Sequence, residues 1–311
     1  MSANTYILCP GQGAQVVGMG KDFHDASNAV RHVFDTANEI LGFDLAKVCF
    51  EGPAERLNQT DVSQPAIYAT SVAAFRAARE AGKIDPAQVT AFAGLSLGEY
   101  TALHLAGAFT FEEGLKLVAA RGRYMQEAAV ATPSSMVAIL GAEQAAVEEL
   151  CAKAAQGEVL VPANFNAPGQ IVVSGSKAAC ERVLGEATNA GMKATPLVVA
   201  GAFHSPLMQP AADRMRVELD KVNFRPLTTT VYSNVTAEPH GESESIKQLL
   251  IKQIVAPVQW ERTMKTLAGE HGGEGARFVE LAPGRTLAGL AKRINRRLPI
   301  ESFATVDALT A

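Results

Sequence analysis

Gly94-Leu95-Ser96-Leu97-Gly98 stands between an apolar run at residues 89–93 and a stretch with a helical pattern that begins at Glu99. A G-x-S-x-G motif between a strand and a helix is typical of a nucleophile elbow, a turn so tight that the serine adopts a strained backbone conformation. Glycines flank the turn because strand and helix approach too closely for side chains. The same letters also arise by chance, but this placement favours Ser96 as a nucleophile. The N–H of Leu97 then lies at a helix N-terminus, where developing negative charge is stabilised.

The composition is that of an ordinary globular protein, with 48% hydrophobic and 19% charged residues. A length of 311 residues allows two domains, or one large α/β domain with an insertion. The net charge of −4 gives no electrostatic reason to expect nucleic acid as a partner. The first residues lack the features of a signal peptide, and no stretch has the length of a membrane span. We therefore expect no membrane partner and a cytoplasmic location.

Residue types that bind metals are too scattered to predict a metal site. The cysteines lie far apart in the sequence, and we expect buried or free thiols in a reducing compartment at Cys9, Cys49, Cys151 and Cys180. The six histidines include no pair with the spacing of a zinc motif. The expected metal content is therefore none.

Residues 132–201 have a pattern of their own. Predicted strands at 136–140, 159–163, 170–174 and 194–199 alternate with predicted helices at 143–155 and 177–190. The order β-α-β-β-α-β is typical of a ferredoxin-like unit. We interpret it as a small domain inserted into a large α/β catalytic domain, which residues 1–131 and 202–311 form together.

The flanking segments alternate between short apolar strands and amphipathic helices. Strands are predicted at 6–9, 229–233 and 277–281, in addition to the strand that precedes Ser96. Helices are predicted at 23–41, 65–81, 111–128, 205–222, 246–255 and 286–297. The fold class is therefore α/β.

A nucleophilic serine needs a base, because its hydroxyl is almost never ionised near neutral pH. His204 follows a predicted strand, and Ser205-Pro206 directly after it is a strong helix-start signal. This junction either exposes His204 to a cleft as the base or gives it only a structural role at the helix start. His104 has apolar neighbours and is expected to be a packed residue. The remaining histidines are expected at the surface: His24, His32, His240 and His271.

Two further segments are candidates for ligand contacts. The loop Cys9-Pro10-Gly11-Gln12-Gly13 follows the first strand, and its glycines allow backbone N–H groups to approach a ligand. It matches neither the dinucleotide fingerprint nor a P-loop, and a plain tight turn is the alternative. Arg121 borders the apolar face of its predicted helix, which indicates an inward side chain that meets an anion. An intramolecular salt bridge is the alternative for Arg121.

Together these segments resemble the malonyl-CoA:acyl carrier protein transacylases of type II fatty acid synthesis, and they are also similar to the acyltransferase domains of polyketide synthases. The matching motifs run in family order over nearly the whole chain: Pro10-Gly11-Gln12-Gly13-Ala14-Gln15, Gly94-Leu95-Ser96-Leu97-Gly98-Glu99-Tyr100, Arg121-Gly122-Arg123-Tyr124-Met125-Gln126, Asn164-Phe165-Asn166-Ala167-Pro168-Gly169-Gln170, Gly201-Ala202-Phe203-His204-Ser205 and Pro257-Val258-Gln259-Trp260. The resemblance implies an α/β-hydrolase-like core with the ferredoxin-like insertion.

The resemblance also implies roles for individual residues. Ser96 is the implied nucleophile and His204 its base, while the main-chain carbonyl of Gln253 orients the imidazole. The backbone N–H groups of Gln12 and Leu97 form the implied oxyanion hole. Arg121 is expected to pair with the free carboxylate of malonate.

Two positions bear on specificity or depart from the pattern. Phe203 matches the malonyl-type Ala-Phe-His sequence, and its ring is expected to exclude an extra methyl group, although discrimination by one methyl is intrinsically modest. The family usually has histidine before the nucleophile, whereas this chain has Leu95. The departure leaves nucleophile, base and carboxylate anchor in place.

The implied reaction moves a malonyl group from malonyl-CoA to an acyl carrier protein and needs no cofactor, because malonyl-CoA is a substrate. A trans-acting polyketide acyltransferase and a thioesterase on the same elbow are the alternatives, and a non-catalytic scaffold is a further rival. Carrier proteins of this class are acidic, so the cations Lys292, Arg293, Arg296 and Arg297 either dock the carrier or merely complement the dipole of the last predicted helix.

Overall fold

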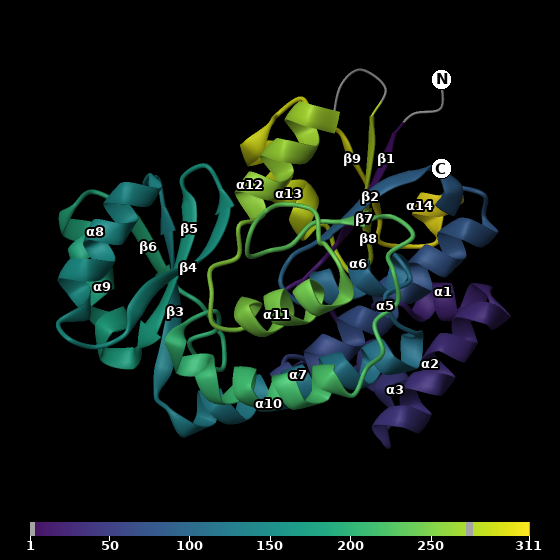
Figure 1. Ribbon diagram of the computed structural model, residues 1–311, viewed down its shortest axis with the longest axis horizontal. Coiled ribbons are helices and arrows are strands. Elements are labelled where there is room, and N and C mark those ends of the chain that lie inside the picture. The colour runs from purple at the N-terminus through teal and green to yellow at the C-terminus, as the bar shows by residue number, and fades with distance from the viewer. Residues whose placement is uncertain (1–3, 272–275, 311) are drawn as a thin grey trace.

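The computed structural model of the chain describes residues 4–271 and 276–310, which form two separate β-sheets (Figure 1). The larger sheet is parallel and has the strand order β7-β2-β1-β8-β9. Its strands are β1 (Thr5–Cys9), β2 (Val89–Gly94), β7 (Thr230–Val231), β8 (Arg277–Leu281) and β9 (Ile300–Phe303). This sheet confirms the predicted α/β class.

Helices cover both faces of the parallel sheet, as a sheet with two apolar faces requires. Successive residues of β1 point to opposite faces. Ile7 and Cys9 therefore join the core under helices α2, α5 and α7, while Tyr6 and Leu8 join the core under α12 and α13. The helices of this part are α1 (Lys21–Ala26), α2 (Asn28–Leu41), α3 (Leu45–Glu51), α4 (Ala54–Leu57), α5 (Thr60–Glu80), α6 (Gly98–Leu105), α7 (Phe111–Ala131), α10 (Gln209–Asp220), α11 (Ser243–Gln253), α12 (Trp260–Thr266), α13 (Thr286–Ile294) and α14 (Asp307–Thr310).

The smaller sheet is antiparallel and has the order β4-β5-β3-β6. It consists of β3 (Ser134–Leu140), β4 (Leu160–Ala167), β5 (Gln170–Ser176) and β6 (Lys193–Pro196), with α8 (Gln144–Ala155) and α9 (Lys177–Asn189) packed on it around a core of its own. The element order confirms the predicted β-α-β-β-α-β unit, at the left of Figure 1. We retain the boundaries near Thr132 and Gly201 as a proposal.

The two sheets are joined where β4 meets the segment before α12. The N–H of Phe165 donates to the carbonyl of Val258 at 2.9 Å, and the N–H of Val258 donates to the carbonyl of Ala163 at 2.9 Å. These backbone bonds hold the small sheet beside the parallel sheet.

Several predicted boundaries were wrong. The predicted helix 23–41 is two helices, because the Ser27 side chain accepts a hydrogen bond from the N–H of Val30 and starts α2 anew. The predicted helix 205–222 begins as a 3-10 turn at Pro206–Met208 before α10. The last predicted helix ends at Ile294, so Arg296 and Arg297 lie beyond it, and strand β9 and helix α12 were not predicted.

Two smaller expectations concern the cysteines and the membrane. All four cysteines are buried free thiols, as expected. In the described part of the chain, no helix combines the length and the apolar character that crossing a bilayer requires.

Candidate active site

Ser96 lies in the turn between β2 and α6 with a φ of 52°, in the left-handed region that non-glycine residues rarely occupy. The flanking glycines are required by sterics. A Cβ atom on Gly94 would lie 1.9 Å from the carbonyl carbon of Gly98, and one on Gly98 would lie 2.1 Å from the carbonyl oxygen of Cys9. The strained serine between two glycines that tolerate no side chain confirms the predicted elbow.

His204 lies beside Ser96. Its Nε2 atom is 2.7 Å from the Ser96 Oγ, and its Nδ1 atom is 2.7 Å from the main-chain oxygen of Gln253. A carbonyl oxygen only accepts hydrogen bonds, so the proton of the neutral imidazole lies on Nδ1 and Nε2 accepts from the serine hydroxyl. The contact to the Gln253 carbonyl is the one that the family resemblance implied. The arrangement is that of a nucleophile with its general base.

The His204 imidazole is held in its neutral form. Burial, and after it the positive charge of Arg121, lower the pKa of His204 from 6.5 to about 4, against the opposing effect of the hydrogen bond to Gln253. A neutral imidazole is the form that accepts a proton from a hydroxyl. Near neutral pH the His204 imidazole is therefore in the form that a general base requires.

Arg121 points from α7 into the same cluster and is buried. One terminal nitrogen donates to the Gln64 Oε1 at 2.8 Å; the other donates to the Ser96 Oγ at 3.0 Å and to the Gln253 Oε1 at 2.8 Å. These partners are neutral, and no described carboxylate forms the intramolecular salt bridge considered above. Burial lowers the pKa of Arg121, while Tyr100 and then Glu99 oppose that effect. A buried cation without an ion-pair partner favours an anionic ligand.

A pocket of about 610 Å³ opens above Ser96, between the ends of the parallel strands and the small sheet. Its wall mixes polar and apolar groups from the small sheet, the loops after β1 and β2, helix α7 and the segment that leads to His204. The lining residues include Gln12, Gln15, Asn58, Leu95, Ser96, Arg121, Met125, Gln126, Met136, Asn164, Asn166, Val172, Leu197, Val198, Phe203 and His204. Leu197 and Val198 belonged to a predicted strand, but β6 ends at Pro196, which leaves them to line the pocket.

The loop after β1 is held against the elbow. The N–H of Leu95 donates to the carbonyl of Cys9 at 3.1 Å, and a Cβ atom on Gly11 would lie 2.3 Å from the carbonyl oxygen of Leu95. Gln12 thereby reaches the pocket wall, and Leu97 is buried at the start of α6. The oxyanion-hole role of their N–H groups stays a prediction.

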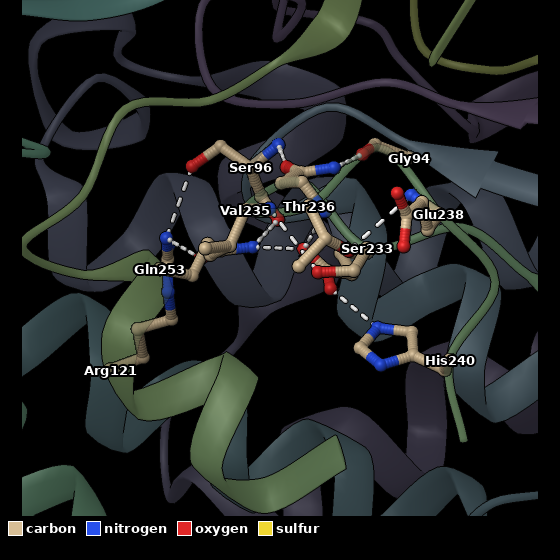
Figure 2. A network of polar contacts seen from close by, with 11 residues as sticks. Gly94, Ser96, Arg121, Ser233, Val235, Thr236, Glu238, His240 and Gln253 are labelled. Carbon is tan, nitrogen blue, oxygen red and sulfur yellow. Dashed lines mark hydrogen bonds and ion pairs between the residues drawn. The ribbon is translucent and has the colours of Figure 1, made fainter. Parts of the chain in front are cut away.

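A second layer of polar residues lies behind Ser96, and the sequence did not reveal it. Figure 2 shows this network between Ser96, Gln253 and His240. His240 was expected at the surface, which was wrong: its side chain is fully buried, and its Nε2 atom is 2.6 Å from the Glu99 Oε1. The only available signal was the place of Glu99 directly after the elbow.

The remaining histidines match their expected positions to different degrees. His104 is packed as expected, with its Nδ1 atom 3.0 Å from the carbonyl oxygen of Phe109. His32 is exposed and His24 is half-buried. His271 lies outside the residues whose side chains the structure describes.

The chain is similar to known proteins over nearly its whole length. A model of the acyl transferase domain matches residues 5–308. The chain belongs to this acyl transferase family. It is 40% identical over 306 residues to the malonyl CoA-acyl carrier protein transacylase of Escherichia coli K12, covering 98% of this chain and 97% of that protein. It is 41% identical over 294 residues to the transacylase of the same name from Bacillus subtilis, covering 94% and 90%.

Solved structures of acyl transferases give the same result. The malonyl CoA-acyl carrier protein transacylase of Coxiella burnetii superposes with a TM-score of 0.94 at 39% identity, covering 100% of this chain and 96% of that one. A malonyl-transacylase in complex with a type II polyketide acyl carrier protein superposes with a TM-score of 0.92 at 36% identity, covering 99% and 98%. The resemblance to the malonyl-CoA:acyl carrier protein transacylases is thereby confirmed.

Proposed function

We propose that this chain transfers the malonyl group of malonyl-CoA to the phosphopantetheine thiol of an acyl carrier protein, through a covalent malonyl-Ser96 intermediate. The transfer supplies fatty acid elongation. One observation carries the proposal: the Ser96 Oγ contacts both the base His204 and the buried cation Arg121. A serine nucleophile beside a cation without an ion-pair partner suits an acyl group that carries its own carboxylate.

The first half-reaction forms the acyl-enzyme. His204 Nε2 takes the proton of the Ser96 hydroxyl as the oxygen attacks the thioester carbonyl. The N–H groups of Gln12 and Leu97 stabilise the tetrahedral oxyanion. The C–S bond then breaks, and the leaving coenzyme A sulfur receives the proton from His204. Arg121 holds the distal carboxylate of malonate throughout.

The second half-reaction reverses these steps with another thiol. His204 takes the proton of the phosphopantetheine thiol, its sulfur attacks the malonyl-serine ester, and the Ser96 oxygen leaves with the proton from His204. Double-displacement kinetics follow from the shared acyl-enzyme. We propose that no cofactor takes part, since every proton moves between the serine, the imidazole and the two thiols, and that the reaction takes place in the cytoplasm.

The test is a transfer assay with the purified chain, malonyl-CoA and a purified phosphopantetheinylated carrier protein. Intact-mass spectrometry should show the carrier protein gaining one malonyl group for each coenzyme A released. Coenzyme A release matched by free malonate, with the carrier unchanged, would instead identify a thioesterase. Methylmalonyl-CoA and acetyl-CoA in parallel reactions measure the acyl selectivity.

A further inference from the structure

The Glu99 carboxylate is buried directly behind the nucleophile and joins two residues that fix the elbow. Its Oε2 atom accepts hydrogen bonds from the Gln253 Nε2 at 2.6 Å and from the Asn234 N–H at 3.2 Å, and its Oε1 atom contacts the His240 Nε2 at 2.6 Å. The side chains of Glu99 and His240 have no exposed surface. A buried carboxylate is costly unless its oxygens are bonded in this way.

Gln253 connects Glu99 to the reacting groups. Its amide nitrogen donates to the carbonyl of Ser96 at 2.9 Å, its amide oxygen accepts from Arg121, and its main-chain oxygen accepts from His204. A carboxylate only accepts and a guanidinium only donates, so Glu99 and Arg121 together permit a single orientation of the Gln253 amide. A rotated amide would face Arg121 with its NH₂ group.

Asn234 connects Glu99 to the backbone of the elbow. Its Oδ1 atom accepts from the N–H of Ser96 at 2.5 Å, and its Nδ2 atom donates to the carbonyl of Gly94 at 2.6 Å. These two bonds span the turn in which Ser96 adopts its positive φ. Such a conformation persists only where the surroundings enforce it.

Asn234 and His240 approach Glu99 from one loop that closes on itself. The N–H of Ser233 donates to the carbonyl of Glu238 at 2.9 Å, and the N–H of His240 donates to the carbonyl of Val231 at 2.8 Å. Figure 2 shows His240 on the far side of this network from Arg121. The loop therefore supplies both a clamp on the elbow and a partner for the carboxylate.

We propose that Glu99 and His240 form a buried positioning pair, which fixes Gln253 and Asn234 and thereby holds the nucleophile, its base and the carboxylate-binding arginine in one geometry. Neither residue touches the reacting atoms. The consequence for acyl selectivity rests on the proposed malonyl transfer, whereas the consequence for the reactivity of Ser96 does not.

The alternative is a purely structural pair at the start of α6, where a negatively charged side chain stabilises the helix through its dipole. Loss of a structural pair lowers thermal stability and leaves the chemistry of the folded fraction unchanged. Loss of a positioning pair misplaces Gln253, which slows Ser96 and weakens the discrimination that Arg121 provides.

The test compares His240→Leu with His240→Gln, whose amide nitrogen takes the place of Nε2. His104→Leu is the matched control, because it removes a packed histidine of α6 whose one hydrogen bond among the described residues is to the carbonyl of Phe109. Two quantities are measured on folded protein: the rate of covalent labelling of Ser96 by an alkyl fluorophosphonate, and the malonyl-to-acetyl ratio of kcat/KM.

We expect His240→Leu to lower the labelling rate and the malonyl-to-acetyl ratio by about tenfold or more, the scale on which small misplacements act. His240→Gln should restore most of both, and His104→Leu should leave both unchanged. Wild-type values in folded His240→Leu, or equal losses in His104→Leu, would overturn the proposal. If the wild-type chain transfers no malonyl group while labelling still follows this pattern, the proposed function fails and the positioning pair stands.

A second variant covers the case in which His240→Leu does not fold. Glu99→Gln keeps the shape of the side chain but turns an acceptor into a donor. If the amide oxygen of the new glutamine still accepts hydrogen bonds from Gln253 and Asn234, its amide NH₂ group faces the Nε2 atom of His240. The imidazole proton must then move from Nε2 to Nδ1, an atom with no described hydrogen-bond partner. We expect slower labelling and a lower malonyl-to-acetyl ratio; wild-type values of both would overturn the proposal.

Discussion

The guanidinium of Arg121 donates a hydrogen bond to the hydroxyl of Ser96 at 3.0 Å, the same oxygen that lies 2.7 Å from the His204 imidazole. The group that we propose to bind the substrate carboxylate therefore already touches the nucleophile. Binding and chemistry are coupled at one atom, because a carboxylate that pairs with Arg121 also changes the charge that Ser96 and His204 experience.

Arg121→Ala should weaken transfer of malonyl more than transfer of acetyl. The variant removes the cation that pairs with the malonyl carboxylate, and acetyl has no carboxylate to lose. We expect kcat/KM for malonyl-CoA to fall by about ten- to a hundredfold relative to acetyl-CoA, the range for hydrogen bonds to a charged group. Arg123→Ala, an exposed arginine on the same helix, is the control. Equal losses for both acyl groups would give Arg121 a structural role only.

The acid limb of the pH profile should lie below the usual range for a histidine. Burial, and after it the charge of Arg121, lower the pKa of His204 from 6.5 to about 4. The base therefore stays neutral as the pH falls through 6, and kcat/KM for the free enzyme should decline only near pH 4. Arg121→Met should move this limb upward, and only partly, because burial remains. A limb at pH 6.5 in the wild type would contradict this assignment.

The lowered pKa of His204 also makes the stability of the folded chain depend on pH. Between pH 6.5 and 4 the unfolded chain binds a proton at His204 that the folded chain does not, so this residue makes the free energy of unfolding fall as the pH is lowered through that window. His204→Gln should flatten the pH dependence of urea unfolding there. An unchanged slope would mean that the imidazole is protonated in the folded state.

Phe203→Ala should admit a branched acyl group. Phe203 is buried and lines the pocket beside His204. Removing the ring frees space for the methyl group of methylmalonyl, and one methyl is worth about tenfold in a close-fitting pocket. The methylmalonyl-to-malonyl ratio of kcat/KM should rise by about that factor in parallel assays. A ratio that stays constant while both rates fall would place the discriminating contact elsewhere.

Gly11→Ala should damage the site through the backbone. Its Cβ atom would lie 2.3 Å from the carbonyl oxygen of Leu95, so either the Gln12 loop or the elbow must move. We expect a loss of about 1–3 kcal/mol in the free energy of unfolding, with a fall in kcat. Gly185→Ala is the control. Apart from its own helix backbone and its chain neighbours, no described atom lies within 4 Å of the added Cβ, and alanine has a higher helix propensity than glycine. Equal effects of the two substitutions would refute the steric argument.

Local patterns predicted the elbow and the order of elements in the small domain, and they made His204 a candidate base whose role only the family resemblance implied. Ser96 and His204 were found because each lies at a strand–helix junction whose signals are contained in a few neighbouring residues. The Glu99–His240 pair was not found, because its members lie 141 positions apart and only the folded loop joins them. His240 also lies within the polar stretch of residues 238–244, so its burial is a tertiary effect. Strand β9 has only four residues, too few for a clear alternation.

The most direct test of the central claim is covalent labelling by radioactive malonyl-CoA in the absence of a carrier protein. The wild-type chain should retain about one malonyl group, located by peptide mapping at Ser96, and should release it to added carrier protein. Ser96→Ala should retain none. Label that persists in Ser96→Ala, or that maps to another residue in the wild type, would contradict the acyl-enzyme mechanism.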